Sequence, residues 1–182
     1  MKSSLKITLT IVAIVILAGI IFFFRQRGPH LPHTRPPHAA GTYITKSRLV
    51  FAGYATPEAA LESMTWAMMN GDYDTSIASL GPEMRADAVK DPKDRKNFES
   101  SMRKMSTRFK GMQIVAKKTL AGDKVELKLK LDVALPSNSH GDVPPFFIQP
   151  MTRFGNEWKL GGSTRGYETN WDQSGQIQTF VQ

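Results

Sequence analysis

The chain has 182 residues, a formal net charge of +8 and no cysteine. Its length fits one domain with short additions, and the lack of cysteine excludes disulfides, thiolate catalysis and cysteine-based zinc sites. Residues 85–130 hold 14 lysines and arginines against six acidic residues, so the charge gathers in one region. The basic region has two interpretations. It could bind an acidic protein or an anionic lipid surface, or it could simply be a solvent-exposed face.

Residues 7–24, "ITLTIVAIVILAGIIFFF", contain no charged side chain. As a helix they would be about 27 Å long, close to the roughly 30 Å hydrocarbon core of a bilayer. A cleaved signal peptide would have a shorter apolar region that ends in small residues, whereas this one ends in "FFFRQRG". We therefore predict a six-residue tail (1–6), a single-pass membrane anchor, and a C-terminal domain on the extracytoplasmic side.

Residues 25–42 form a segment rich in proline and histidine. Its four prolines favour an extended chain and oppose a helix, so we predict a spacer. Three of the four histidines, His30, His33 and His38, lie here. Tracts of this kind can bind metal, but no carboxylate or cysteine is close in the sequence, and we predict neither a metal site nor any cofactor.

The domain is predicted to span 43–182 and to open with a weak edge strand over 43–51. The next stretch, "TPEAALESMTWAMMNGDYDTSIASL", predicts two consecutive helices. Thr56 is the N-cap of the first, with Pro57 at the first helical position. The pair Asn70-Gly71 ends this helix, and Asp72 caps the second.

A short turn is predicted at "GPEM", and a long amphipathic helix follows from Asp91 to Gly111. Its apolar residues recur at helical spacing while its outer face is basic. Those residues are Phe98, Met102, Met105 and Phe109.

The hydrophobic period then changes to two. In "KVELKLKLDV" apolar residues alternate with charged ones, which predicts a strand with one buried and one wet face, paired with a strand over 113–120. Residues 146–154 and 157–161 predict a second hairpin, in which Pro150 marks an edge or a bulge. Helices followed by an antiparallel meander predict an α+β fold in which helices pack on a curved antiparallel sheet of about four strands. The tail beyond residue 161 has no clear pattern.

The helix, Gly-Asp break and helix of residues 56–80, together with "TRFGNEWKLGG", resemble the nuclear-transport-factor-like superfamily, which has a cystatin-like cone fold. Small envelope-anchored members of unknown function are the most similar. The resemblance covers roughly Pro57 to Gly161 and implies a cone that encloses a cavity or a packed core. It implies either an isomerase or dehydratase that uses an inward-facing carboxylate or histidine, or a binding or assembly module. Members of the superfamily also often dimerise through the sheet.

Candidates for acid–base chemistry are few. His140 lies in a Ser/Gly/Pro-rich loop and Asp132 follows the polar alternation, so both are expected to face water. Glu58 and Glu62 are one helical turn apart and fit two solvent-facing carboxylates on a helix flank. General acid–base catalysis requires a desolvated group, and none is evident on the apolar stripes of the helices.

We therefore predict a membrane-tethered, non-enzymatic module that binds a protein partner or a small apolar ligand. The predicted pocket lining is Leu61, Met64, Met68, Phe98, Met102 and Met105, with Trp66 and Tyr73 at its mouth. The alternatives are a small-molecule isomerase or dehydratase and an adaptor for anionic lipid or acidic protein. The adaptor surface would comprise Arg103, Lys104, Arg108, Lys110, Lys117 and Lys118. Nucleic acid is not an expected partner, and a homodimer remains an open alternative.

Overall fold

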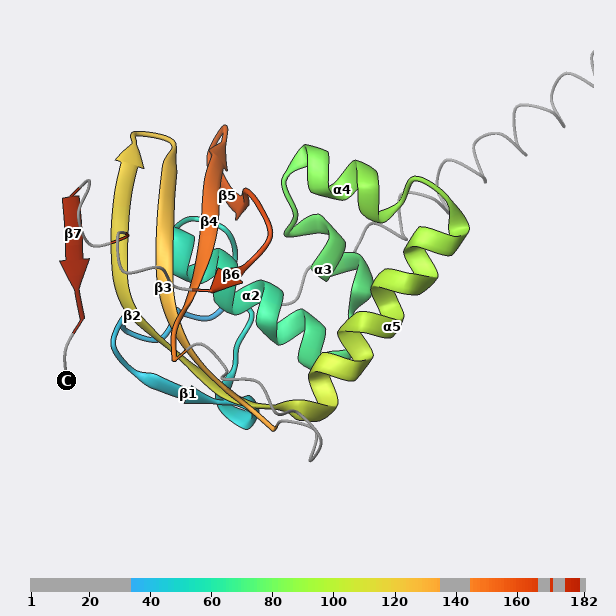
Figure 1. Cartoon of the computed structure of the whole chain (residues 1–182), viewed down its shortest axis with the longest axis horizontal. Helices are drawn as coiled ribbons and strands as arrows, with labels where there is room; N and C mark the ends of the chain where they lie inside the picture. Colours follow the sequence, from blue (N-terminus) through green and yellow to red (C-terminus); the bar gives the residue numbers. More distant parts are fainter. Residues whose placement is uncertain (1–33, 135–144, 167–170, 172–175, 181–182) are drawn as a thin grey trace, which may run out of the picture. The chain divides into compact units, whose positions relative to one another are not determined.

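The computed structural model of the chain describes residues 34–134, 145–166, 171 and 176–180 (Figure 1). The predicted anchor at 7–24 and the first part of the predicted spacer lie outside the described residues. None of the helices in the described part is both long and apolar enough to cross a bilayer. Residues from Thr34 to Gln182 group as one compact unit.

The helices begin and end where local sequence signals dictate. They are η1 (Lys46–Arg48, a 3-10 turn), α2 (Pro57–Asn70), α3 (Tyr73–Ala78), α4 (Pro82–Ala88) and α5 (Pro92–Arg108). Thr56 Oγ1 accepts a hydrogen bond from the Ala59 amide, and Gly71 ends α2 at a left-handed φ of 69°, a conformation that favours glycine. Asp72 caps α3 by accepting from Thr75 N. The predicted helix pair is confirmed.

The strands form one curled antiparallel sheet in the order β1-β2-β3-β4-β5, with β6 beside β4 and β7 beside β2. Their bounds are β1 (Tyr43–Thr45), β2 (Phe109–Ala121), β3 (Lys124–Val133), β4 (Phe147–Phe154), β5 (Glu157–Leu160), β6 (Arg165–Gly166) and β7 (Gln176–Thr179). The α+β class and both predicted hairpins are confirmed. The predicted edge strand over 43–51 is only three residues long, and β6 and β7 come from the tail without a clear pattern.

The main core lies between α2 and the sheet (Figure 1). It is built from Leu80, which lies between α3 and α4, and from apolar side chains of α2 and strands β2 to β5, whose alternation turns one face of each strand toward the helix. Its buried members are Ala60, Leu61, Leu80, Ile114, Val125, Leu127, Leu129, Met151, Trp158 and Leu160. The space beneath α2 is therefore filled by the protein's own side chains.

Helix α5 ends at Arg108, not at Gly111 as predicted. Gly111 lies inside β2 opposite Thr45, where a Cβ atom would come within 2.5 Å of Tyr43 Oη and 2.8 Å of the Ile44 carbonyl oxygen. Glycine is required here because another strand crosses closely. Glycine thus has two different roles in this chain: Gly71 ends a helix, whereas Gly111 allows two strands to approach closely.

The outer face of the sheet was predicted to be wet, and this prediction is wrong at Glu126. Trp171 lies on that face and packs with Ala116, Ile148 and Ile177 in a separate apolar cluster. Glu126 is consequently buried. The polar alternation of β3 identified the two faces correctly, but the segment that covers one of them is distant in sequence.

Pro150 lies where β4 changes its partner. Residues 151–154 pair with β5 and residues 147–148 pair with β6, while the Pro150 carbonyl accepts from Gly161 N at 2.9 Å. The N–H and C=O of a strand residue point to the same side, so the missing N–H faces the junction between β5 and β6. Pro150 was predicted to mark an edge or a bulge, but it pairs with Glu126 in a continuous register with β3, inside a strand that has neighbours on both sides.

Candidate functional site

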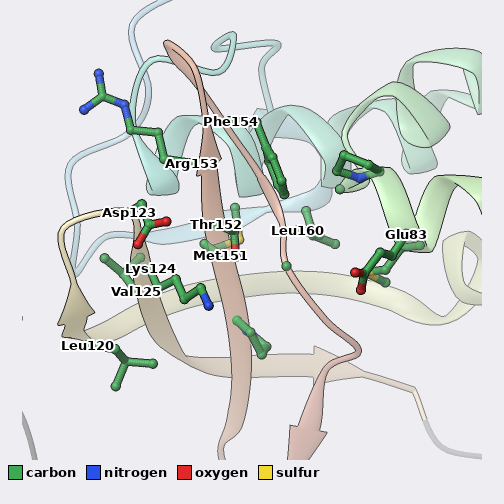
Figure 2. Close-up of a pocket in the computed structure, with 15 residues that line it drawn as sticks. Glu83, Leu120, Asp123, Lys124, Val125, Met151, Thr152, Arg153, Phe154 and Leu160 are labelled. Atoms are coloured by element: carbon green, nitrogen blue, oxygen red, sulfur yellow. The ribbon is translucent and has the colours of Figure 1, made fainter.

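A groove lies between the first turn of α4 and the end of the sheet formed by the β2–β3 turn and β4 (Figure 2). It encloses about 550 Å³. Gly81 brings α4 close to the sheet because its amide donates to the Leu160 carbonyl at 2.9 Å, and a Cβ at this position would come within 2.9 Å of that oxygen. The sequence "GPE" thus sets one wall of the groove.

The floor of this groove is apolar and its rim is charged. Val125, Met151 and Leu160 form the floor and belong to the main core. Four charged residues lie on the rim: Glu83, Asp123, Lys124 and Arg153. Glu83 belongs to α4 and lies across the groove from the hairpin residues Asp123 and Lys124 (Figure 2). Such a combination suits a ligand with apolar groups and charges of both signs.

A second groove of about 450 Å³ runs along α4 and shares Pro82 and Phe154 with the first. Val89 and Phe154 line it, and Leu120 and Phe154 line the first. The described part of the chain has five exposed large apolar side chains, and Val89, Leu120 and Phe154 are three of them. Exposed apolar residues thus gather around α4.

The predicted pocket lining is split between the core and the surface. Leu61 and Met68 are buried, Met64 and Phe98 pack against the main core, Met102 is half-buried and Met105 is exposed. None of these six residues lines the two grooves beside α4. The two residues predicted at the pocket mouth are both half-buried, but they lie at different places. Trp66 lines a third pocket and Tyr73 does not. A hydrogen bond with Tyr73 raises the pKa of the Arg103 guanidinium.

The predicted basic surface is also divided. Arg103, Lys104, Arg108 and Lys110 are exposed on α5 and the start of β2. Lys117 instead forms an ion pair with Glu58 of α2, with 2.8 Å between Nζ and Oε1. Lys118 is 4% exposed and donates to the Trp171 carbonyl at 2.7 Å. The placement of Lys118 on a surface was therefore wrong, because Lys118 is buried against Trp171.

Glu62 is the main correction to the chemistry predicted from the sequence, because its side chain is only 2% exposed. Its Oε1 lies 2.7 Å from His38 Nδ1 and accepts from Val50 N at 3.2 Å, while Oε2 accepts from His38 N at 2.9 Å. The prediction of a solvent-facing carboxylate is wrong because residues 34–53 cross this flank of α2. His38, predicted to lie in the spacer, is part of the compact unit.

The contacts of Glu62 indicate a structural role. The segment that crosses α2 has partly buried amides that need acceptors, and the carboxylate accepts from those of His38 and Val50. Ser63, its neighbour, accepts from Ala52 N and donates to the Gly53 carbonyl in the same way. In the sequence, the adjacent pair Glu62-Ser63 within the apolar part of α2 was the signal for these contacts.

Glu126 is the second buried carboxylate that the sequence left unrecognised. It accepts from Trp171 Nε1 at 2.6 Å and from Arg165 Nη2 at 2.7 Å. Both donors come from the tail that had no clear pattern, so no local signal could have paired them. These bonds hold Arg165 and Trp171 to the sheet, and Glu126 lines none of the three pockets.

Neither buried carboxylate suits acid–base catalysis, since both have their oxygens occupied by protein donors. The acidic residues on the rim of the first groove, Glu83 and Asp123, are exposed, and a general acid or base depends on desolvation. Across the described ranges, no group of three or more His, Asp or Glu residues could hold a metal ion. His140 lies outside the described residues.

Comparisons with known proteins show limited similarity. The sequence matches no protein-family model and no curated protein. A similar solved structure is the solution structure of a SEC-C motif containing protein from Rhodopseudomonas palustris, with 14% sequence identity and a TM-score of 0.46. The match covers 63% of this chain and 80% of that protein.

Proposed function

We propose that the chain is a non-enzymatic binding module that takes an apolar segment of a protein partner at the paired grooves beside α4. The observation that carries this proposal is the position of Val89, Leu120 and Phe154, three exposed apolar side chains that line the two grooves. Monomeric proteins rarely leave apolar side chains clustered at a hollow surface unless a partner covers them. Phe154, shared by both grooves, is the expected anchor.

The charged rim supports a protein partner over a small apolar ligand. Two acidic and two basic side chains border the first groove. A small apolar ligand would leave these charges unused, whereas a peptide segment can present complementary charges that set its orientation. The partner is therefore expected to carry apolar side chains flanked by residues of both charges.

The membrane anchor and the superfamily remain part of the proposal. Residues 7–24 would hold the module at a membrane, on the extracytoplasmic side. The helix, Gly-Asp break and helix, followed by an antiparallel sheet, support membership of the nuclear-transport-factor-like superfamily. The isomerase or dehydratase alternative has less support because it requires an available buried acid or histidine, and Glu62 is engaged by His38 and Val50.

The test is site-specific photo-crosslinking in the source cells. Benzoylphenylalanine replaces Val89, Leu120 or Phe154 in the full-length chain, and Met105, which is exposed at 40% on α5, serves as the matched control. The proposal expects the same discrete crosslinked product from the three groove positions and not from position 105. A product that forms equally from position 105, or none from any groove position, would contradict it.

A second variant identifies the anchor. Phe154→Ala is expected to lower the yield of the Leu120 crosslink about tenfold, because an aromatic anchor commonly contributes more than 1 kcal/mol to binding. Phe154 is 41% exposed, so the folded protein should tolerate the change. An unchanged yield in a normally folded variant would remove Phe154 from the interface.

A further inference from the structure

A third pocket lies between η1, the end of α2 and the start of β2, and encloses about 550 Å³. Its lining contains two lysines and no acidic residue. The lining residues are Thr45, Lys46, Ser47, Leu49, Trp66, Met69, Asn70 and Lys110. This pocket brings together Trp66, predicted to lie at a pocket mouth, and Lys110, predicted to face an anionic partner.

The two ammonium groups have donors to spare. Lys46 Nζ donates one hydrogen bond, to the Ser106 carbonyl at 2.6 Å, and a lysine carries three N–H groups. Lys110 is exposed and forms no ion pair or hydrogen bond through its side chain within the described ranges. Two positive charges at one pocket, with no acid in its lining, favour an anionic group.

Trp66 supplies an apolar ring beside these charges. It is half-buried, and its ring is held by an edge contact with Phe51 at a centroid distance of 5.7 Å. Leu49 and Met69 extend the apolar part of the lining. The indole N–H of Trp66 has no hydrogen-bond acceptor among the described residues, although tryptophan usually finds one when it is partly buried.

Small polar groups complete the lining. Thr45 Oγ1 and Ser47 Oγ lie 3.3 Å apart, and each hydroxyl keeps lone pairs for another partner. Asn70 donates its amide to the Trp66 carbonyl at 2.8 Å, which orients the side chain and leaves its oxygen as an acceptor. A ligand that fills this pocket thus meets charge, a ring face and hydrogen-bonding groups.

We propose that this pocket binds a cyclic organic acid, with its ring against Trp66 and its acid group held by Lys46 and Lys110. Lysine binds an anion as a point charge and imposes little geometry, so the site accepts a carboxylate or a phosphate. The ring can be aromatic or a sugar, since both have an apolar face. This site is separate from the grooves beside α4 and does not depend on the function proposed for them.

The experiment is a titration of the full-length chain, held in detergent micelles if it requires them, followed by nuclear magnetic resonance. The reporters are the indole N–H of Trp66, assigned through Trp66→Phe, and the methyl group of Met69. The probes are two matched pairs, glucuronate against glucose and benzoate against benzyl alcohol. We expect at least one acid to shift both reporters with a dissociation constant of roughly 0.1–1 mM, and its neutral counterpart to bind at least tenfold more weakly.

The two pairs distinguish a sugar acid from an aromatic acid. Lys46→Gln and Lys110→Gln are each expected to weaken binding about threefold, and the double variant about tenfold, as for exposed charge pairs. Lys96→Gln, an equally exposed lysine on α5, is the matched control and should leave binding unchanged. The spectrum of each variant without probe shows whether it is folded.

Three results would overturn the proposal: no acid shifts the two reporters at 10 mM or so, the neutral probes bind as well as the acids, or the folded double variant binds like the unmodified chain. Shifts that also appear throughout α5 and persist in the double variant would indicate general attraction to the basic surface, and this too counts against a defined site.

Discussion

At the scale of single residues, Glu62 joins the segment before β1 to helix α2. Its two carboxylate oxygens accept from two backbone amides and contact the His38 ring. Buried donors that lose their acceptor retain the full cost of desolvation, so this carboxylate matters for stability even without a catalytic role. The same reasoning explains why an acidic residue persists on a helix with nine buried positions.

We expect Glu62→Ala to lower the free energy of unfolding by about 2–4 kcal/mol, because it leaves two partly buried amides and a histidine without their acceptor. Urea denaturation of the full-length chain measures this change. Glu83→Ala, at an exposed position, should stay within about 0.5 kcal/mol of the unmodified protein. If Glu62→Ala changed the free energy of unfolding as little as Glu83→Ala does, the contacts of Glu62 with His38 and Val50 would not stabilise the fold.

Tyr54 provides a prediction about pH. Burial raises the pKa of its phenol, the Ser79 hydroxyl lowers it by a smaller amount, and the negative charges of Glu157 and Asp72 raise it further. The folded state therefore holds the phenolic proton more tightly than the unfolded state does. The resulting stability is complete below the unfolded pKa of about 10 and is lost as pH rises through the folded value.

Denaturation of the full-length chain between about pH 9 and pH 12 should therefore show falling stability as the phenol ionises. Tyr54→Phe should reduce the steepness of this fall, since phenylalanine cannot ionise. Tyr43 is expected to contribute a further part, because burial and its hydrogen bond to Asp132 also raise its pKa. An identical pH profile in Tyr54→Phe would show that Tyr54 does not contribute.

At the scale of elements, the pairing of β1 with β2 depends on Gly111. The register places Tyr43, Ile44 and Thr45 opposite Gln113, Met112 and Gly111. The strands can approach only because position 111 lacks a side chain, as the close contacts with Tyr43 and the Ile44 carbonyl demonstrate. The backbone atoms among these contacts cannot turn away as a flexible side chain would.

Gly111→Ala is accordingly expected to destabilise the fold by about 1–3 kcal/mol, the usual cost of overpacking. Thermal unfolding of the full-length chain measures this effect. Gly122→Ala is the matched control, since an added Cβ at this turn position meets no atom within 4 Å. Equal effects of the two substitutions would mean that β1 detaches from the sheet without cost.

At the scale of the whole molecule, the structure leaves fewer basic residues available to a partner than the sequence predicted. Lys117 forms an ion pair with Glu58, and Lys118 is buried against Trp171. Four of the six residues of the predicted basic surface remain exposed, on α5 and the start of β2, and Lys110 among them lines the pocket of Trp66. Any electrostatic partner should therefore engage this end of the domain.

The boundary of the domain yields a whole-molecule prediction. Residues 34–42 were predicted as spacer, but Arg35 N donates to the Phe51 carbonyl and Gly41 N to the Ile114 carbonyl. A fragment that begins at Thr34 should thus fold with the stability of the full-length chain in urea. A fragment that begins at Tyr43 should lose about 2 kcal/mol or more, since it lacks His38 and these bonds. If the two fragments were equally stable, residues 34–42 would act as a spacer and would not contribute to the stability of the domain.

The sequence alone determined the features that depend on neighbouring residues. Thr56, Pro57, Gly71 and Asp72 set the helix bounds because caps act over a few residues, and the alternation in β3 separated its two faces because side chains repeat every second residue. These local signals were sufficient to predict the α+β class and both hairpins.

Only the tertiary structure decided which polar residues are buried and where the hollows lie. Glu62 is covered by residues 34–53, and Glu126 contacts Arg165 and Trp171, which lie far from it in the chain. The methionines of α2 and α5 line none of the grooves beside α4, while Leu120 and Phe154, which had no helical pattern, do. A periodic pattern shows which residues share a face of a helix or strand. It does not show which other segment packs on that face, and burial depends on that segment.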